Sequence, residues 1–450
     1  MMHLSERLQK ARAEADLAIG DLIDGTLRAN LLDASCLRGN ENLANLFKHD
    51  LLEKANGDML YARVALAIIV RKVPATEDWL DAFLEELPED VPGLYMRTLL
   101  RVPEMHRETV RRALVWQRFT FQKMSLGEFG EALRVPLEPL DKLGEFKLGD
   151  FELGEPFPDP LATVDMLPGI LFVRSPPSPA SPSSSSSDGN NNDNLQQVQI
   201  GHGSFLDFIE SELIKRPGPK EAQDFAMDKA GTKQGFIVAC LRYFLHAAGE
   251  VRDLVDKDEI LRAFPLAECS AKHGLRLVEG MTYEKQRPEP LENMMRQIFS
   301  SKDAVRLLNL VGTWSGTLVG FEDFLGPLSY PIGKGQLRIL RFLLRRRNDD
   351  RAGTLARISA IVTEEDVNAG LHQACASNNY ELVEFLLFYG ADGRAPAGKY
   401  LCAADTALQH GSDFIVKILL NGRNGIAQSC AEKKHPHLVT WPLPGSPLPV

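Results

Sequence analysis

Two stretches near the carboxyl end of the 450-residue chain repeat each other. The first is LHQACASNNYELVEFLLFYGAD, residues 371–392, and the second is ADTALQHGSDFIVKILLNG, residues 404–422. Three sets of matched positions are each separated by 33 residues: Ala374 and Ala407, Val383 and Val416, Leu386-Leu387 and Leu419-Leu420. One register kept over segments of this length indicates two copies of one structural unit.

A period of 33 residues is typical of ankyrin repeats, in which a turn and two helices form one unit. An earlier copy at 327–344 ends in a Leu-Leu pair that lies 43 residues before the next one, which indicates a 10-residue insertion near 345–362. Each unit exposes an apolar face that stacking must bury. We therefore predict a short ankyrin-repeat solenoid over 326–425 and a Pro-rich disordered tail over 426–450. An unrelated stack of helical hairpins remains the alternative.

Composition and charge limit the function classes. Apolar residues make up 44% and charged residues 25%, which is typical of globular proteins. Residues 1–216 carry 23 Lys and Arg against 34 Asp and Glu, so this half would repel a nucleic acid. The longest strongly apolar run, Val64 to Val70, has 7 residues, whereas a membrane span needs about 20. The six cysteines form no CxxC motif, and no signal peptide is visible. We expect a cytoplasmic protein that binds no membrane.

Motifs for catalysis are missing from the sequence. No GxxxxGK[ST] phosphate loop occurs, and the nearest stretch, residues 333–336, lacks both the upstream Gly and the Ser or Thr. Residues 201–204 hold Ser and His close to Asp207, but neighbours in sequence rarely form a triad. His435 and His437 have no third ligand nearby. We predict no enzyme activity, no catalytic residue, no cofactor and no metal site.

The residues before the repeats predict helices and one hairpin. Asn56-Gly57 marks a helix end, Ser125 with Glu128 forms a capping box, and Ser204 with Asp207 repeats that arrangement. The stretches 169–174 and 197–202 are β-prone and flank a Ser/Pro/Asn-rich insertion, 175–197, that we expect to be disordered.

The order of these elements predicts a mainly α protein with four parts. A helical segment covers 1–100, and three helices with a β-hairpin form a winged-helix domain over 101–216. A helical linker covers 217–325, followed by the repeats. Winged helices often bind DNA, but the candidate recognition helix at 126–134 holds two Glu and one Arg. DNA binding is therefore disfavoured.

Seven short segments carry a resemblance to a known family: LEKANG at 52–57, LEELP at 84–88, LVW at 114–116, PGIL at 168–171, HGSFLDF at 202–208, FPLAE at 264–268 and SAKH at 270–273. In this order they resemble the region after the NACHT module of fungal NACHT–ankyrin proteins, which are NLR-like (STAND) signalling ATPases. The winged-helix part is similar to the module known as the GPI inositol-deacylase winged helix, a label that implies no catalysis. The resemblance spans residues 44–425.

The resemblance also implies a role for one histidine. In related proteins the His of the H-x-S-F-x-[DE]-F stretch reaches the bound nucleotide, and here that residue is His202. The chain begins after the expected end of a NACHT module, so His202 would sense a nucleotide only if that module came from another chain. The alternative is a structural His at a strand end. A second departure is Gly274, where the family tends to place Trp, which suggests weaker packing in the linker.

We expect a non-catalytic scaffold that binds a protein partner through the ankyrin repeats. Polar residues at the turn and first-helix positions are the candidate contacts: His372, Asn378, Asn379, Tyr380, Gln409 and His410. A rival hypothesis is a regulatory fragment that acts on a NACHT NTPase in trans, or a truncated gene product. Winged-helix DNA binding is the third.

Overall fold

The computed structural model shows a mainly helical chain. It describes residues 2–28, 41–70, 77–120, 123–138, 151–155, 159–174, 196–215, 220–251, 256–281, 289–312, 326–344, 362–410 and 412–421. The chain divides into two compact units: unit 1 is Met1–Pro139 with Leu153–Phe236, and unit 2 is Leu140–Glu152 with Ile237–Val450. The tail at 426–450, with His435 and His437, lies outside the described residues.

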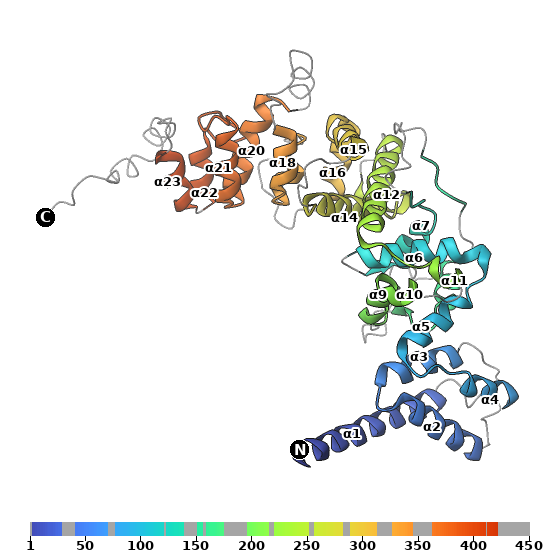
Figure 1. The fold of residues 1–450 in the computed structure, drawn as a ribbon. Helices are drawn as coiled ribbons and strands as arrows, with labels where there is room; N and C mark the ends of the chain where they lie inside the picture. Colours follow the sequence, from blue (N-terminus) through green and yellow to red (C-terminus); the bar gives the residue numbers. More distant parts are fainter. Residues whose placement is uncertain are drawn as a thin grey trace, which may run out of the picture. The chain divides into compact units, whose positions relative to one another are not determined.

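Unit 1 begins with a group of helices (Figure 1): α1 (Met2–Thr26), α2 (Glu41–Ala55), α3 (Met59–Val70), α4 (Glu77–Glu85) and α5 (Val91–Leu100). α2 ends as predicted, because Asn56 and Gly57 take left-handed backbone angles with φ of 47° and 81°. Asp90 begins α5 by accepting a hydrogen bond from the amide of Gly93. α3 is apolar on most sides because α1, α2 and α5 all pack against it.

A small sheet follows in unit 1. Its elements are η2 (Glu104–His106), α6 (Arg107–Phe119), β1 (Met124–Ser125), α7 (Leu126–Ala132), α8 (Pro160–Met166), β2 (Leu171–Arg174) and β3 (Gln197–Ile200). The strands are antiparallel in the order β1-β3-β2, with Leu171 opposite Ile200 and Arg174 opposite Gln197. The two predicted hairpin strands are therefore present. Most of the insertion between them, residues 175–195, lies outside the described residues.

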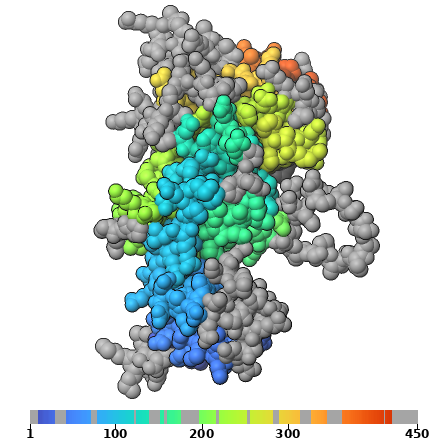
Figure 2. All heavy atoms as spheres, turned by 90° about the vertical axis from the view of Figure 1, so that its right-hand side faces the viewer, coloured from blue at the N-terminus to red at the C-terminus, as the bar shows by residue number. Residues whose placement is uncertain are grey.

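The predicted capping box of α7 is confirmed. Ser125 Oγ accepts from the Glu128 amide at 3.2 Å, and the Ser125 amide donates to Glu128 Oε2 at 2.7 Å. α6 supplies the core beneath, where the buried ring of Trp116 meets that of Phe236 edge-on at 4.9 Å. In the space-filling view, side chains of α5 and α6 (cyan) form part of the visible surface of unit 1 (Figure 2).

The predicted cap of the next helix was wrong. α9 (Gly203–Glu210) begins before Ser204, and its N-cap is His202, whose Nδ1 accepts from the Ser204 amide at 3.2 Å. Because the imidazole already satisfies that amide, Ser204 lies inside the helix and Asp207 has no capping role. Two short helices, α10 (Glu212–Lys215) and α11 (Lys220–Gln223), complete this region.

The boundary between the units falls within α12 (Lys229–Glu250). Unit 2 continues with α13 (Lys257–Ala263), α14 (Ala267–Glu279), α15 (Glu289–Ser300), α16 (Lys302–Val311), α17 (Ser329–Gly333), α18 (Leu337–Leu344), α20 (Glu364–Ala376), α21 (Tyr380–Phe388), α22 (Ala403–Gln409) and α23 (Asp413–Asn421). Short polar caps begin several of these helices, including Asp256 for α13, Ser301 for α16 and Thr363 for α20.

Gly274 lies at a close approach of α14 to α12 in unit 2. A Cβ atom there would be 2.9 Å from Cys240 Cβ and 3.5 Å from Leu241 Cδ2. The site is buried and has no room for Trp, the residue that the resembling family tends to place there. The glycine therefore allows close helix packing here, and its small size is not a packing defect.

Gly169→Ala is expected to lower the free energy of unfolding of unit 1 by about 2 kcal/mol. Gly169 has a φ of 77°, and a Cβ there would lie 3.0 Å from Val64 Cα and 3.2 Å from Val64 O, both backbone atoms of α3. Hydrogen exchange of the α3 and β2 amides in the full chain measures the loss. Gly203→Ala is the matched control, because nothing lies within 4 Å of its Cβ position. Equal effects of the two substitutions would contradict the explanation.

Candidate functional site

Three helix pairs stack in the described part of the repeat region: α17 with α18, α20 with α21, and α22 with α23. The first helices contact one another in sequence, and α21 contacts α23 (Figure 1). Ala374 and Ala407, which the 33-residue register matched, are both fully buried where these helices meet. The insertion at 345–361 and the residues after Asn421 lie outside the described residues.

His372 is not on the repeat surface, although its polar side chain made it a candidate contact. Its ring is fully buried and joins three elements. Nδ1 lies 2.7 Å from Thr406 Oγ1 of α22, and Nε2 lies 2.8 Å from the carbonyl oxygen of Ala395 in the connecting loop. Burial lowers the pKa of His372 below its ordinary value. This histidine therefore links one repeat to the next.

The turn between α20 and α21 carries three of the predicted residues. Asn378 is exposed and takes a left-handed backbone angle with a φ of 53°, a conformation that Asn tolerates. Asn379 caps α21, because its Oδ1 accepts from the Leu382 amide at 3.2 Å. Tyr380 is 48% exposed. The side chains of Asn378 and Tyr380 are exposed to solvent, whereas the side-chain amide of Asn379 is used within the turn.

The remaining two candidates end the first helix of the following repeat. Gln409 and His410 are exposed. Gln409 Nε2 donates to Asp405 Oδ1 at 3.1 Å, and His410 Nε2 lies 3.0 Å from the hydroxyl of the buried Tyr400. These contacts hold both side chains at the surface in fixed positions.

Exposed apolar residues of the repeats were missed by the sequence reasoning. Phe388 is 84% exposed, Phe414 is 61% exposed and Leu401 is 51% exposed. The 33-residue register predicts that such residues lie in helices, but it does not predict which of their side chains a neighbouring helix buries. The sequence does hold one sign that Phe388 is exposed. The buried residues Leu382, Val383 and Leu386 lie on one side of α21, and Phe388 falls on the other side.

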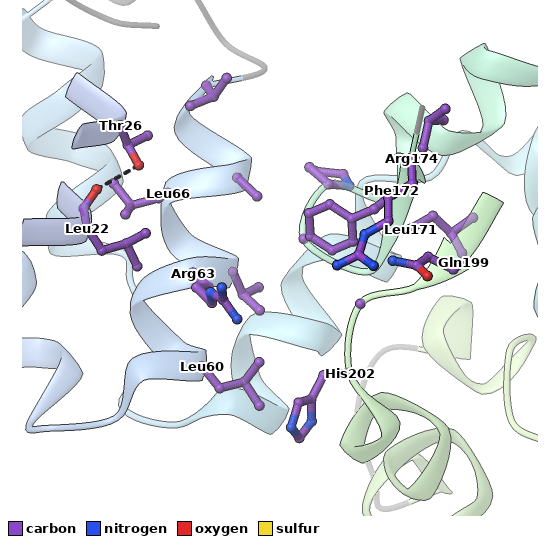
Figure 3. A pocket seen from close by; sticks show the side chains of 17 residues that line it. Leu22, Thr26, Leu60, Arg63, Leu66, Leu171, Phe172, Arg174, Gln199 and His202 are labelled. Atoms are coloured by element: carbon purple, nitrogen blue, oxygen red, sulfur yellow. Dashed lines mark hydrogen bonds between the residues drawn. The ribbon is translucent and has the colours of Figure 1, made fainter. Parts of the chain in front are cut away.

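A pocket of about 650 Å³ lies in unit 1, a size typical of ligand sites. α1 and α3 form one wall and the β2–β3 hairpin forms the other, with His202 next to Leu60 at one end (Figure 3). Its lining is mostly apolar, including Leu22, Val64 and Phe172. Two guanidinium side chains, Arg63 and Arg174, join this lining, and neither has an ion-pair partner among the residues that the structure describes. The pocket therefore suits an anionic group beside an apolar one.

The orientation of His202 at this pocket is set by two hydrogen bonds. Its Nδ1 accepts from the Ser204 amide and lies 2.8 Å from Ser204 Oγ, which in turn lies 2.9 Å from the hydroxyl of Tyr95. Because Nδ1 accepts, the neutral ring carries its proton on Nε2. The Nε2–H group is then a donor available to a ligand, so the structural role and a ligand contact are compatible.

The residues that the structure describes contain neither a metal-binding cluster nor a membrane-spanning helix. No group of three or more His, Cys, Asp and Glu side chains in the described ranges could hold a metal ion. No helix within those ranges combines the length and the apolar character that crossing a bilayer requires.

Comparison with known proteins identifies one repeat. A model of the ankyrin repeat family matches residues 368–395, which contain most of α20, all of α21 and the loop up to Ala395. No curated protein and no solved structure matches the chain. The chain therefore contains an ankyrin repeat, a motif that carries no catalysis and serves protein interaction.

Proposed function

We propose that this ankyrin-containing protein is a non-catalytic scaffold that binds a protein partner through residues 326–425. The observation that supports this most directly is the ankyrin match at 368–395, which lies within a stack of helix pairs. The surface contacts would come from Asn378, Tyr380, Gln409 and His410, with Asn379 holding the turn. A repeat stack offers a broad surface without a closed site, which suits protein recognition.

Photo-crosslinking from the repeat surface tests this function. A photoreactive residue is placed at Gln409 of the full chain, and a matched control carries it at Lys123, an exposed residue of unit 1. We expect defined adducts with one protein species from Gln409 and none of that species from Lys123. Identical adduct patterns from both positions, or no adduct from Gln409, would refute the proposal.

The resemblance to NACHT–ankyrin proteins extends the proposal to unit 1. The order α6, β1, α7, α8, β2, β3 with a three-stranded antiparallel sheet supports a winged-helix module over 101–216. On this proposal the scaffold is NLR-like, and its unit 1 is the part that would associate with a NACHT module of another chain.

A second candidate function follows from the pocket in unit 1. Arg63, Arg174 and the Nε2–H of His202 could together bind the phosphates of a nucleotide, while Leu60 and Phe172 cover its apolar part. The resemblance assigns His202 to nucleotide sensing with a NACHT module supplied in trans, whereas this second proposal uses only pocket residues of this chain and needs no other module.

Calorimetric titration of the full chain with ADP tests this second function. Arg63→Gln is expected to weaken ADP binding about tenfold, since one charge-assisted contact is lost. Arg101→Gln removes an exposed arginine of the same unit that does not line the pocket, and should leave binding unchanged. If ADP does not bind, or if both variants bind ADP equally well, the pocket has no nucleotide role.

A further inference from the structure

Three aromatic side chains on the second helices of the repeats remain uncovered. Phe388 and Tyr380 belong to α21 and Phe414 to α23, and we call these three residues the outer aromatic patch. Their apolar neighbours on the same helices, such as Leu386 and Ile415, are fully buried. Exposed rings of this size gain free energy when a partner covers them.

The patch extends across two consecutive repeats. The rings of Tyr380 and Phe414 meet edge-on at 5.9 Å, which connects α21 to α23. Tyr380, Glu384 and Phe388 are spaced by four residues and therefore lie along one face of α21. The ring of Phe388 also meets that of Tyr389 at 5.4 Å. A partner on this face would contact apolar groups about two helical turns apart, with an acidic group between them.

The surroundings of the patch are acidic. Glu381, Glu384 and Asp413 are all exposed on the same two helices, where Lys417 is the exposed basic residue. Over residues 362–421 the chain has eight Asp and Glu against three Lys and Arg. This charge repels nucleic acids and anionic membranes, and it also opposes pairing of the patch with its copy on a second chain.

We propose that the outer aromatic patch binds a basic amphipathic helix of a protein partner, with apolar side chains against the rings and Lys or Arg beside Glu384. The inference rests on the proposed scaffold function and deepens it, because it adds the second-helix face of the repeats to the binding surface and names the chemistry of the partner. The ordinary mode for such a contact is an amphipathic helix that lays its apolar side on an apolar surface.

Fluorescence anisotropy of the full chain with labelled synthetic peptides tests the proposal. The probes are an amphipathic helical peptide of leucine and lysine, its leucine and glutamate counterpart, and a lysine peptide of the same length without leucine. We expect binding of the first peptide alone, at a salt concentration near physiological. The double variant Phe388→Ser/Phe414→Ser should weaken it about thirtyfold, and Glu384→Lys about fivefold.

Leu401→Ser is the matched control, because it removes an exposed apolar side chain of the same repeats outside the patch. It should change binding less than twofold. Far-ultraviolet circular dichroism checks that all variants keep their helix content. Equal binding of both leucine peptides, binding of the lysine peptide without leucine, or a double variant that binds as well as the original chain would overturn the proposal.

Sedimentation of the full chain tests whether a second copy of the chain occupies the patch. A dimer that disappears in the Phe388→Ser/Phe414→Ser variant would show that a second copy covers the patch, and this would overturn the proposal. The scaffold function is judged separately. If photo-crosslinking from Gln409 captures a partner that binds the double variant as tightly as the original chain, the scaffold function is supported and the patch proposal fails. If no partner is captured while the leucine and lysine peptide binds, the patch stands and the wider function fails.

Discussion

His372→Ala is expected to lower the free energy of unfolding of the repeat region by about 4 kcal/mol, the range of large-to-small substitutions in a core. The ring fills a fully buried site between α20, α22 and the loop at Ala395. Its removal leaves a cavity and takes away the partner of the Ala395 carbonyl, a partly buried group that then loses this hydrogen bond. Chemical denaturation of the full chain, followed by hydrogen exchange of the α20 and α22 amides, measures the change.

Two further variants identify the cause of this loss. Glu384→Ala truncates an exposed residue of the same repeats and should change stability by less than about 0.5 kcal/mol. Thr406→Val removes only the hydroxyl that faces His372 Nδ1. In a double-mutant cycle, His372 and Thr406 should show a coupling energy of about 1 kcal/mol or more. Independent effects would mean that the ring acts by filling space and that the hydrogen bond contributes nothing.

Acidification is the second change with a large expected effect, and it acts on unit 2 through His273. Burial, followed by the nearby charges of Lys272 and Arg276, lowers the pKa of His273 to about 4. An unfolded histidine has a pKa near 6.5, so between these values the unfolded chain binds more protons than the folded one. Stability is therefore complete above about pH 6.5 and falls as the pH decreases toward 4, by about 2 kcal/mol or more at pH 4.5.

The His273→Leu variant separates this effect from the titration of carboxylates. Leucine does not titrate, so the variant should lose about 2 kcal/mol less than the original chain between pH 7 and pH 4.5. Burial also lowers the pKa of His372, so this residue adds to the loss of stability at low pH in both chains. Denaturant titrations at the two pH values provide the measurement. If the free energy of unfolding changed with pH by the same amount in both chains, His273 would take up no proton on unfolding.

Local signals in the sequence predicted much of the fold. The Asn56-Gly57 helix end and the Ser125–Glu128 capping box depend on residues only a few positions apart, and the structure has both. The paired strands β2 and β3 were also predictable, because Val198 and Ile200 alternate with polar residues. β1 was not, since a strand of two residues carries no periodicity and forms only because β3 offers a free edge.

The surface of the repeats could be predicted only in part, because burial is decided by neighbours distant in sequence. His372 has the polar character of a surface residue, yet its ring is buried against Thr406, which lies 34 positions further along the chain. Phe388 and Phe414 have the apolar character of core residues, yet the helices beside them leave them exposed. The N-cap of α9 is the imidazole of His202. The usual preference for Ser or Asp at the N-cap position predicts Ser204 instead.

The contact of His372 with Thr406 makes the repeat of α20 and α21 depend on the repeat that follows it. A messenger RNA that stopped translation before codon 406 would remove more than one helix pair, because the histidine it kept would face water or an empty space. Such a shortened product should be a substrate for cellular quality control, and it should not survive as a smaller working protein. We therefore expect that any repeat replacing the last one would have to supply its own partner for this ring.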